Sequence, residues 1–203
     1  VLLGSGMLIY DIEATTGTIL DRSELISDHG INTLVALPDG DVLVGTTISP
    51  PTAGKPGDAK TAMVYRFSMQ TRKVTGKWLM EPDTPAVRDM VVGPDGLVYG
   101  LALPNRFFVF DPARGEFVHT ENLDAYGIPT GHQAPRSMTV GPDGKIYAIF
   151  RDAVARIEPG TFKHTEIARP NATITVGIAI QGDRLYFGCG PKLFSCALSP
   201  KAK

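Results

Sequence analysis

This 203-residue sequence has only two cysteines, a net charge close to zero and no long apolar run. The net charge of −1 offers no electrostatic surface for nucleic acid or an anionic membrane. No run approaches the roughly 18 apolar residues that a membrane-spanning helix needs. The sequence begins without Met, so we expect residues to have been removed upstream. We therefore expect no nucleic-acid partner and no membrane span, and the compartment is left open, with an extracytoplasmic or secreted location slightly favoured.

The two cysteines, Cys189 and Cys196, lie close together in FGCGPKLFSCAL. A tight turn at Lys192 and Leu193 would place them opposite each other on paired strands, where they could form a disulfide. A turn one residue pair earlier would put them out of register. We favour the interpretation as two small buried thiols, and the redox compartment is undecided.

Several catalytic motifs are also absent. The sequence has no Gly-x-Ser-x-Gly elbow, no phosphate-binding loop, no His-Glu-x-x-His and no cysteine zinc cluster. No segment combines helical periodicity with end caps. These absences indicate a chain of strands without a ready-made catalytic set.

A repeated segment is the clearest signal that is present. MVVGPDGLVYGLA at 90–102 returns as MTVGPDGKIYAIF at 138–150, and two further segments, 34–46 and 177–189, fit the same frame. The frame aligns Leu2, Leu43, Tyr99, Tyr147 and Tyr186, at spacings of 41, 56, 48 and 39 residues. The shortest spacing is about the length of a four-stranded propeller blade. Pro-Asp-Gly joins the first two strands because Pro presets φ and Gly accepts a positive φ.

We name the four strands of each unit A to D in chain order. Strand C follows B at segments such as RFFVFD and AVARIE, and D alternates polar and apolar residues, as a half-exposed strand does. The first unit lacks A, the next three are complete and the last ends after C. We therefore predict an all-β chain, a β-propeller of four-stranded antiparallel blades, as a C-terminal fragment of a six- to eight-bladed ring. A twisted β-sandwich or a small ring that closes alone is the alternative.

The whole chain, 1–203, is expected to form one propeller domain. Its blade-like units are predicted at about 1–30, 31–86, 87–134, 135–174 and 175–203, the first and last incomplete. Unpaired sheet edges invite association, so the missing upstream blades of the same protein are an expected partner.

Two long loops locate a candidate site. Residues 48–60 separate B from C in the second unit, and residues 121–135 separate D of the third unit from the next A. In a propeller these loops emerge on one rim, opposite the Pro-Asp-Gly turns, and we call it the loop rim. Loops on a rigid scaffold concentrate ligand contacts, although tolerated surface insertions would look the same.

The residues just before each A strand lie on the loop rim. Arg88 and Arg136 are equivalent in the repeat, and two guanidinium groups suit a carboxylate or sulfate, unless each only ties down backbone carbonyls. His132 is the candidate catalytic base because a histidine pKa lies near neutrality. His119 and His164 fall in outer strands and are expected to be solvated. The predicted ligand-binding residues are Arg88, Asp89, Arg136, His29 and Gln133.

The units VVGPDGLVYGLALPNRFFVFDPARGEF and TVGPDGKIYAIFRDAVARIEPGTF resemble blades of the NHL-type superfamily. That group includes streptogramin lyase-like and gluconolactonase-like β-propellers, generally of six or seven blades. The lyase-like members imply His and Glu chemistry with a divalent metal, but Tyr99 and Tyr147 stand where they usually have Trp. Neither their His and Glu set nor the acidic and Asn metal ligands of the gluconolactonase-like proteins can be matched here. The resemblance therefore implies the fold and transfers no catalytic residue.

The leading functional hypothesis is a binding propeller whose loop rim holds a small anionic or carbohydrate ligand or a partner protein. The alternative is a lyase or hydrolase of a polysaccharide, lactone or cyclic ester, with His132 as base and Arg88 or Arg136 holding the substrate. A structural domain of a larger secreted or envelope protein is a third reading. No metal ligand is named, and a divalent metal at the channel mouth is left open.

Overall fold

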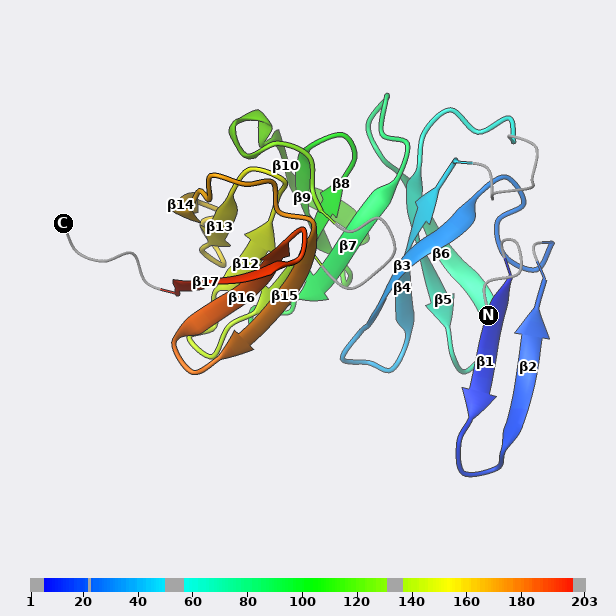
Figure 1. Cartoon of the computed structure of the whole chain (residues 1–203). Helices are drawn as coiled ribbons and strands as arrows, with labels where there is room; N and C mark the ends of the chain where they lie inside the picture. Colours follow the sequence, from blue (N-terminus) through cyan, green and yellow to red (C-terminus); the bar gives the residue numbers. More distant parts are fainter. Residues whose placement is uncertain (1–5, 22, 50–56, 131–136, 199–203) are drawn as a thin grey trace. The chain divides into compact units, whose positions relative to one another are not determined.

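The computed structural model describes residues 6–21, 23–49, 57–130 and 137–198. In these residues the chain forms five antiparallel sheets and one short 3-10 helix (Figure 1). It divides into two compact units, residues 1–87 and 88–203, which are described separately. The described residues contain no helix with the length and apolarity needed to cross a membrane.

The first unit holds a two-stranded and a four-stranded sheet, each ordered as in the sequence. Its strands are β1 (Met7–Asp11), β2 (Thr16–Leu20), β3 (Gly30–Ala36), β4 (Val42–Thr47), β5 (Met63–Ser68) and β6 (Lys73–Leu79). Met7 and Leu20 from the smaller sheet pack with Val44, Tyr65 and Phe67 from the larger one. The two sheets therefore share one apolar core.

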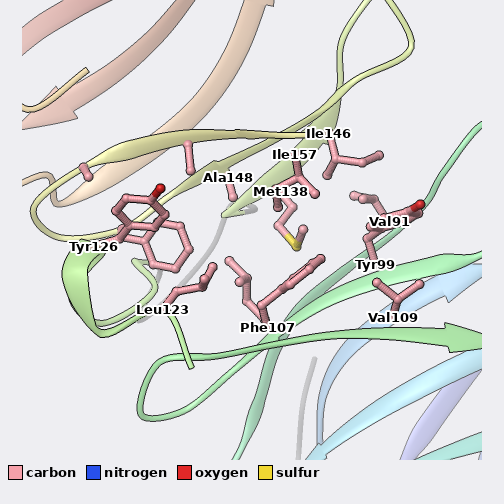
Figure 2. Close-up of a cluster of buried hydrophobic side chains, with 14 residues drawn as sticks. Val91, Tyr99, Phe107, Val109, Leu123, Tyr126, Met138, Ile146, Ala148 and Ile157 are labelled. Carbon is pink, nitrogen blue, oxygen red and sulfur yellow. The ribbon is translucent and has the colours of Figure 1, made fainter. Parts of the chain in front are cut away.

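The second unit holds three sheets. Its elements are β7 (Val87–Val92), β8 (Val98–Ala102), β9 (Arg106–Asp111), β10 (Glu116–Asn122), η1 (Asp124–Tyr126), β11 (Met138–Val140), β12 (Ile146–Ile149), β13 (Val154–Ile157), β14 (His164–Ala168), β15 (Val176–Gln181), β16 (Arg184–Cys189) and β17 (Lys192–Ala197). Figure 2 shows Tyr99, Phe107 and Ile146 in the cluster that joins the β7–β10 sheet to the β11–β14 sheet. A second cluster, which includes Tyr147 and Phe187, joins β11–β14 to β15–β17.

The strand pattern follows the predicted frame. The described part of the first sheet has two strands that correspond to C and D, three sheets have all four strands, and the last has A to C. The B strands β8 and β12 are the most buried, since every residue of each is buried. This explains their continuous apolar sequences, because a strand covered on both faces has no solvent side to alternate with.

The Gly-Pro-Asp-Gly-x-x-Tyr repeat is a packing motif. Tyr147 is fully buried on β12, and its hydroxyl donates to Asp143 Oδ2 in the turn at 2.8 Å. The ring lies directly over Gly141, where a Cβ would come within 2.4 Å of ring carbon Cε2. The first Gly is therefore needed because the tyrosine ring occupies the space of a side chain. Tyr99, Asp95 and Gly93 repeat the arrangement, with a hydroxyl-to-carboxylate distance of 2.6 Å.

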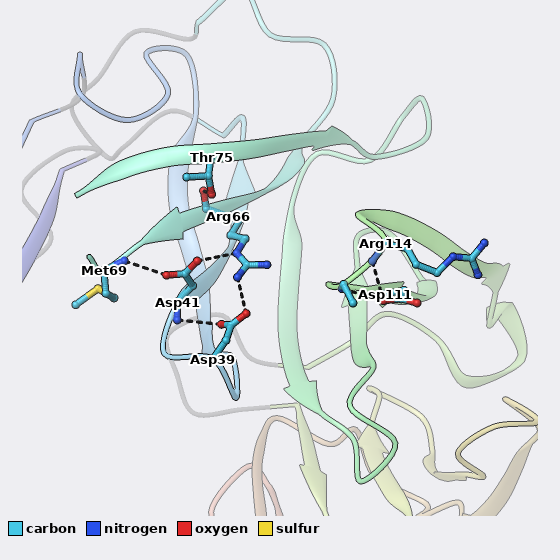
Figure 3. Close-up of polar contacts among 8 residues, drawn as sticks. Asp39, Asp41, Arg66, Met69, Thr75, Asp111 and Arg114 are labelled. Carbon is cyan, nitrogen blue, oxygen red and sulfur yellow. Dashed lines mark hydrogen bonds and ion pairs between the residues drawn. The ribbon is translucent and has the colours of Figure 1, made fainter. Parts of the chain in front are cut away.

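The repeat that forms β3–β6 lacks this tyrosine, and its turn aspartate has a different hydrogen-bond partner. Leu43 replaces the tyrosine, and Leu37 replaces the first Gly because no ring covers it. The turn carboxylate of Asp39 then pairs with Arg66 at 2.5 Å, and Asp41 binds the same guanidinium at 2.8 Å (Figure 3). The Arg66 bond lowers the pKa of Asp41.

The cysteines do not face each other. The turn joining β16 to β17 falls at Gly190 and Pro191, which pairs Cys189 with Lys192 and Cys196 with Leu185. Gly190 has a φ of 57°, a conformation that suits glycine at a tight turn. Both cysteines are free, with Cys189 buried and Cys196 partly buried, so the thiol interpretation is confirmed.

We predict that Gly141→Ala destabilises the chain by about 1–3 kcal/mol because the added Cβ overlaps the Tyr147 ring. The cost should fall clearly when Tyr147→Leu is already present, as Leu37 and Leu43 coexist in the repeat that forms β3–β6. A double-mutant cycle from urea unfolding measures this coupling. Purely additive effects would contradict the packing account.

Candidate functional site

The structure places only some of the predicted loop-rim residues. His132, Gln133 and Arg136 lie outside the described residues, so the pairing of Arg136 with Arg88 stays a prediction. Arg88 and Asp89 are neighbours on β7 in the second unit, and His29 directly precedes β3 in the first.

Asp89 links two sheets of the second unit. Its carboxylate is buried, with the residue 5% exposed, and Oδ2 accepts the backbone N–H of Met138 in β11 at 2.9 Å. Oδ1 accepts the N–H of Met90 at 2.9 Å. Satisfying a buried N–H avoids the cost of an unpaired donor, so Asp89 contributes to the junction whatever else it binds.

Arg88 presents the cation of the predicted site. It lies on β7, an A strand at one edge of its sheet, and is partly buried. Burial lowers the pKa of Arg88, although a guanidinium stays protonated at physiological pH.

His29 is held in one orientation. Its ring is 7% exposed, and Nε2 lies 3.0 Å from the carbonyl oxygen of Thr61. The carbonyl only accepts, so Nε2 is the donor of this contact, and in the neutral ring the lone pair is then on Nδ1. Nδ1 has no hydrogen-bond partner among the described residues, and neither does the buried hydroxyl of Thr84. The arrangement gives His29 a basic nitrogen within the first unit.

The outer-strand histidines differ from the expectation that they are solvated. His119 packs against Phe162, with ring centroids 5.2 Å apart, and His164 Nδ1 bonds the hydroxyl of Tyr126 at 2.8 Å. Their imidazole Nε2 atoms lie 3.2 and 3.7 Å from Glu121 Oε1. Only the helical turn η1 within the long 121–135 loop brings Tyr126 there, so strand alternation could not reveal the contact. Among the described residues, no group of three or more His, Cys, Asp or Glu is arranged to hold a metal ion.

Comparison with solved structures gives strong matches in overall fold. Virginiamycin B lyase from Staphylococcus aureus matches with a TM-score of 0.63 at 15% identity, over 94% of this chain and 62% of the lyase chain. The Dos1 propeller matches with a TM-score of 0.64 at 12% identity, over 94% of this chain and 46% of that one. The chain has a β-propeller fold.

An extracellular domain of the one component system BT4673 from B. thetaiotaomicron matches similarly, with a TM-score of 0.66 at 13% identity. The match covers 95% of this propeller chain and 25% of that chain. No family model matches the sequence, and no curated protein does. The propeller chain thus spans less than two thirds of these structures, and identities this low show the fold alone.

We predict that Asp89→Ala lowers the free energy of unfolding by about 1–3 kcal/mol, because the N–H of Met138 loses its acceptor. Hydrogen exchange at Met138 should accelerate as well. Asp183→Ala, at an exposed turn, is the matched control and should change neither quantity. An unchanged unfolding energy for Asp89→Ala would mean that the carboxylate has no role in the junction.

Proposed function

We propose that this chain is part of a ligand-binding propeller whose loop rim takes a small anionic ligand, such as a carboxylated or sulfated sugar. The observation that carries the proposal is the partly buried Arg88 guanidinium on the A strand β7. A strands surround the central channel of a propeller, so this cation belongs to the channel mouth. Arg136, Gln133, His29 and Asp89 complete the proposed set.

Electrostatics support an anion over a neutral ligand. A partly buried cation interacts more strongly with an opposite charge than an exposed one does, because water screens it less. Arg88 and Arg136 fall at the same position of adjacent repeats, which supports two guanidinium groups directed at one ligand. Two carboxylate or sulfate oxygens match the planar donors of each guanidinium.

The comparisons are compatible with binding and with catalysis. The propellers with similar structures include extracellular domains of one- and two-component systems as well as a lyase. Their identities of 12–16% carry no ligand over to this chain. Residues beyond this chain could supply further contacts, since each match covers only part of the larger structure.

The test is a comparison of Arg88→Gln with Arg114→Gln. Arg114 lies in the β9–β10 turn, on the rim of the Pro-Asp-Gly turns, and its side chain is 67% exposed. Titration calorimetry with oligogalacturonate and with a sulfated disaccharide should show binding that Arg88→Gln weakens about tenfold or more. Arg114→Gln removes the same charge and should leave the affinity unchanged. Equal effects of both substitutions, or no binding of either anion, would contradict the proposal.

A lyase or hydrolase is the second candidate function, and the geometry of His29 supports it. The unpartnered Nδ1 of this buried ring is a base-competent nitrogen, and His132 is the other proposed base on the loop rim. One structural match is virginiamycin B lyase in an inactive variant with quinupristin. The proposed reaction is a β-elimination: the histidine base removes a proton from carbon, the C–H electron pair forms a C=C bond, and the C–O bond of the ester or glycoside breaks. The leaving oxygen departs as a carboxylate or takes a proton from water, while Arg88 or Arg136 holds the substrate.

For the enzyme candidate, we expect incubation with quinupristin, followed by mass spectrometry, to show an opened ring. His29→Ala and His132→Ala, tested separately, should identify the base by at least a hundredfold loss of rate. Folding of each variant is checked by circular dichroism. Intact quinupristin after prolonged incubation would remove this cyclic ester as a substrate.

A further inference from the structure

The last sheet carries an open apolar hollow on one face. The hollow has a volume of about 410 Å³, and Val176, Tyr186, Gly188 and Leu193 are among the residues that line it. Leu193 is 76% exposed and Val176 42%. The opposite face of the same sheet is buried against β11–β14 through Leu185 and its neighbours. One face of the β15–β17 sheet is therefore covered by a neighbouring sheet, and the other face is exposed.

The hollow exists because of a glycine. Gly188 lies opposite Val176 in the β15–β16 pairing, and a Cβ on Gly188 would come within 2.7 Å of Val176 Cγ1. The side chain of Val176 thus lines the side of the hollow, and the backbone of Gly188 forms its floor. A side chain arriving from outside could reach the backbone of β16 here.

The first unit contains the same arrangement with the space filled. Gly45 lies two residues after Leu43, as Gly188 lies two residues after Tyr186, and Gly45 pairs with Thr33. A Cβ on Gly45 would come within 2.7 Å of Thr33 Cγ2 and 2.6 Å of Val87 Cγ1. Val87 is the last residue of the first unit and also the first residue of β7, the next A strand. At Gly45 the space above the glycine is therefore filled by the β-branched side chain that begins the following A strand, whereas Leu101 and Ile149 stand at the equivalent positions of the next two repeats.

The tyrosines of the repeat indicate the same direction of contact. The Tyr99 hydroxyl accepts the N–H of Gly160 at 3.4 Å, and the Tyr147 hydroxyl lies 3.3 Å from the carbonyl oxygen of Leu198. Each partner belongs to the next sheet along the chain. Both tyrosines are fully buried, whereas Tyr186, at the equivalent position, is only partly buried. Tyr99 and Tyr147 each contact the following sheet, whereas Tyr186 has no following sheet among the described residues.

We infer that the open face of β15–β17 is a socket for a further propeller blade, supplied by residues outside this 203-residue chain. The Gly188 floor takes the β-branched side chain that opens the A strand of that blade, and Leu193 and Tyr186 are covered beside it. Continuity with the Gly45–Val87 and tyrosine contacts distinguishes this occupant from a second copy of the chain or a small apolar ligand.

The experiment measures whether the socket is covered in the protein as its own cells produce it. Leu193→Cys is introduced into a Cys189→Ala and Cys196→Ala background, and maleimide labelling rates are compared with those of the 203-residue chain made alone. Ala113→Cys, at the exposed β9–β10 turn, is the matched control. We expect the thiol introduced at position 193 to react at least about 30-fold more slowly in the cellular protein, with no difference at position 113.

A second variant separates the possible occupants. Leu193→Asp should leave the urea midpoint of the isolated chain unchanged, because the side chain is exposed, and should lower the midpoint of the cellular protein. Equal labelling at position 193 in both proteins would overturn the inference. Protection in the isolated chain that accompanies a dimer in light scattering would also overturn it, because the occupant would then be a second copy.

Discussion

The B strands β8 and β12 are buried on both faces, and β12 is covered on one face by the β7–β10 sheet and on the other by the β15–β17 sheet. Every residue of β8 and β12 is buried, so neither sheet could keep its apolar residues from water alone. The cover of Tyr99 comes from the next sheet, where Phe162 packs against its ring and Gly160 donates a backbone N–H to its hydroxyl. Stability in such an array arises mainly at the junctions between sheets.

The turn carboxylates follow from that constraint. A Pro-Asp-Gly turn brings an aspartate next to the buried B strand, where its charge needs a donor. Tyr99 and Tyr147 supply a hydroxyl from the strand itself, and burial together with the carboxylate raises the pKa of both. Where Leu43 replaces the tyrosine, Arg66 supplies the donor from the neighbouring strand. The backbone frame thus stays constant while the partner of the aspartate changes.

The sequence predicted the strand order well, because the Pro-Asp-Gly turns and the doubly apolar strands are local signals. The turn between Cys189 and Cys196 was left open, because Gly190 and Lys192 both begin residue pairs that could occupy it, and only the pairing register decides. The contacts of His164 could not be predicted either, since Tyr126 reaches it from a long loop without periodicity. The bond of Asp89 to the next sheet could not be predicted either, because its backbone partner Met138 is distant in sequence.

Equivalent positions of the repeat show why the fold can be predicted from the sequence and the ligand cannot. Thr33, Asp89, Ser137 and Val176 occupy one position of the A strand. Thr33 lines a filled glycine space, Asp89 holds the next sheet, Ser137 donates to the carbonyl of Thr130 in the long loop, and Val176 lines an open hollow. Strand pairing fixes the backbone position, while the contacts of each side chain depend on the residues that lie next to its own sheet. Specificity in a propeller therefore depends on the neighbours of each blade, and a site on the loop rim needs all the blades that surround it.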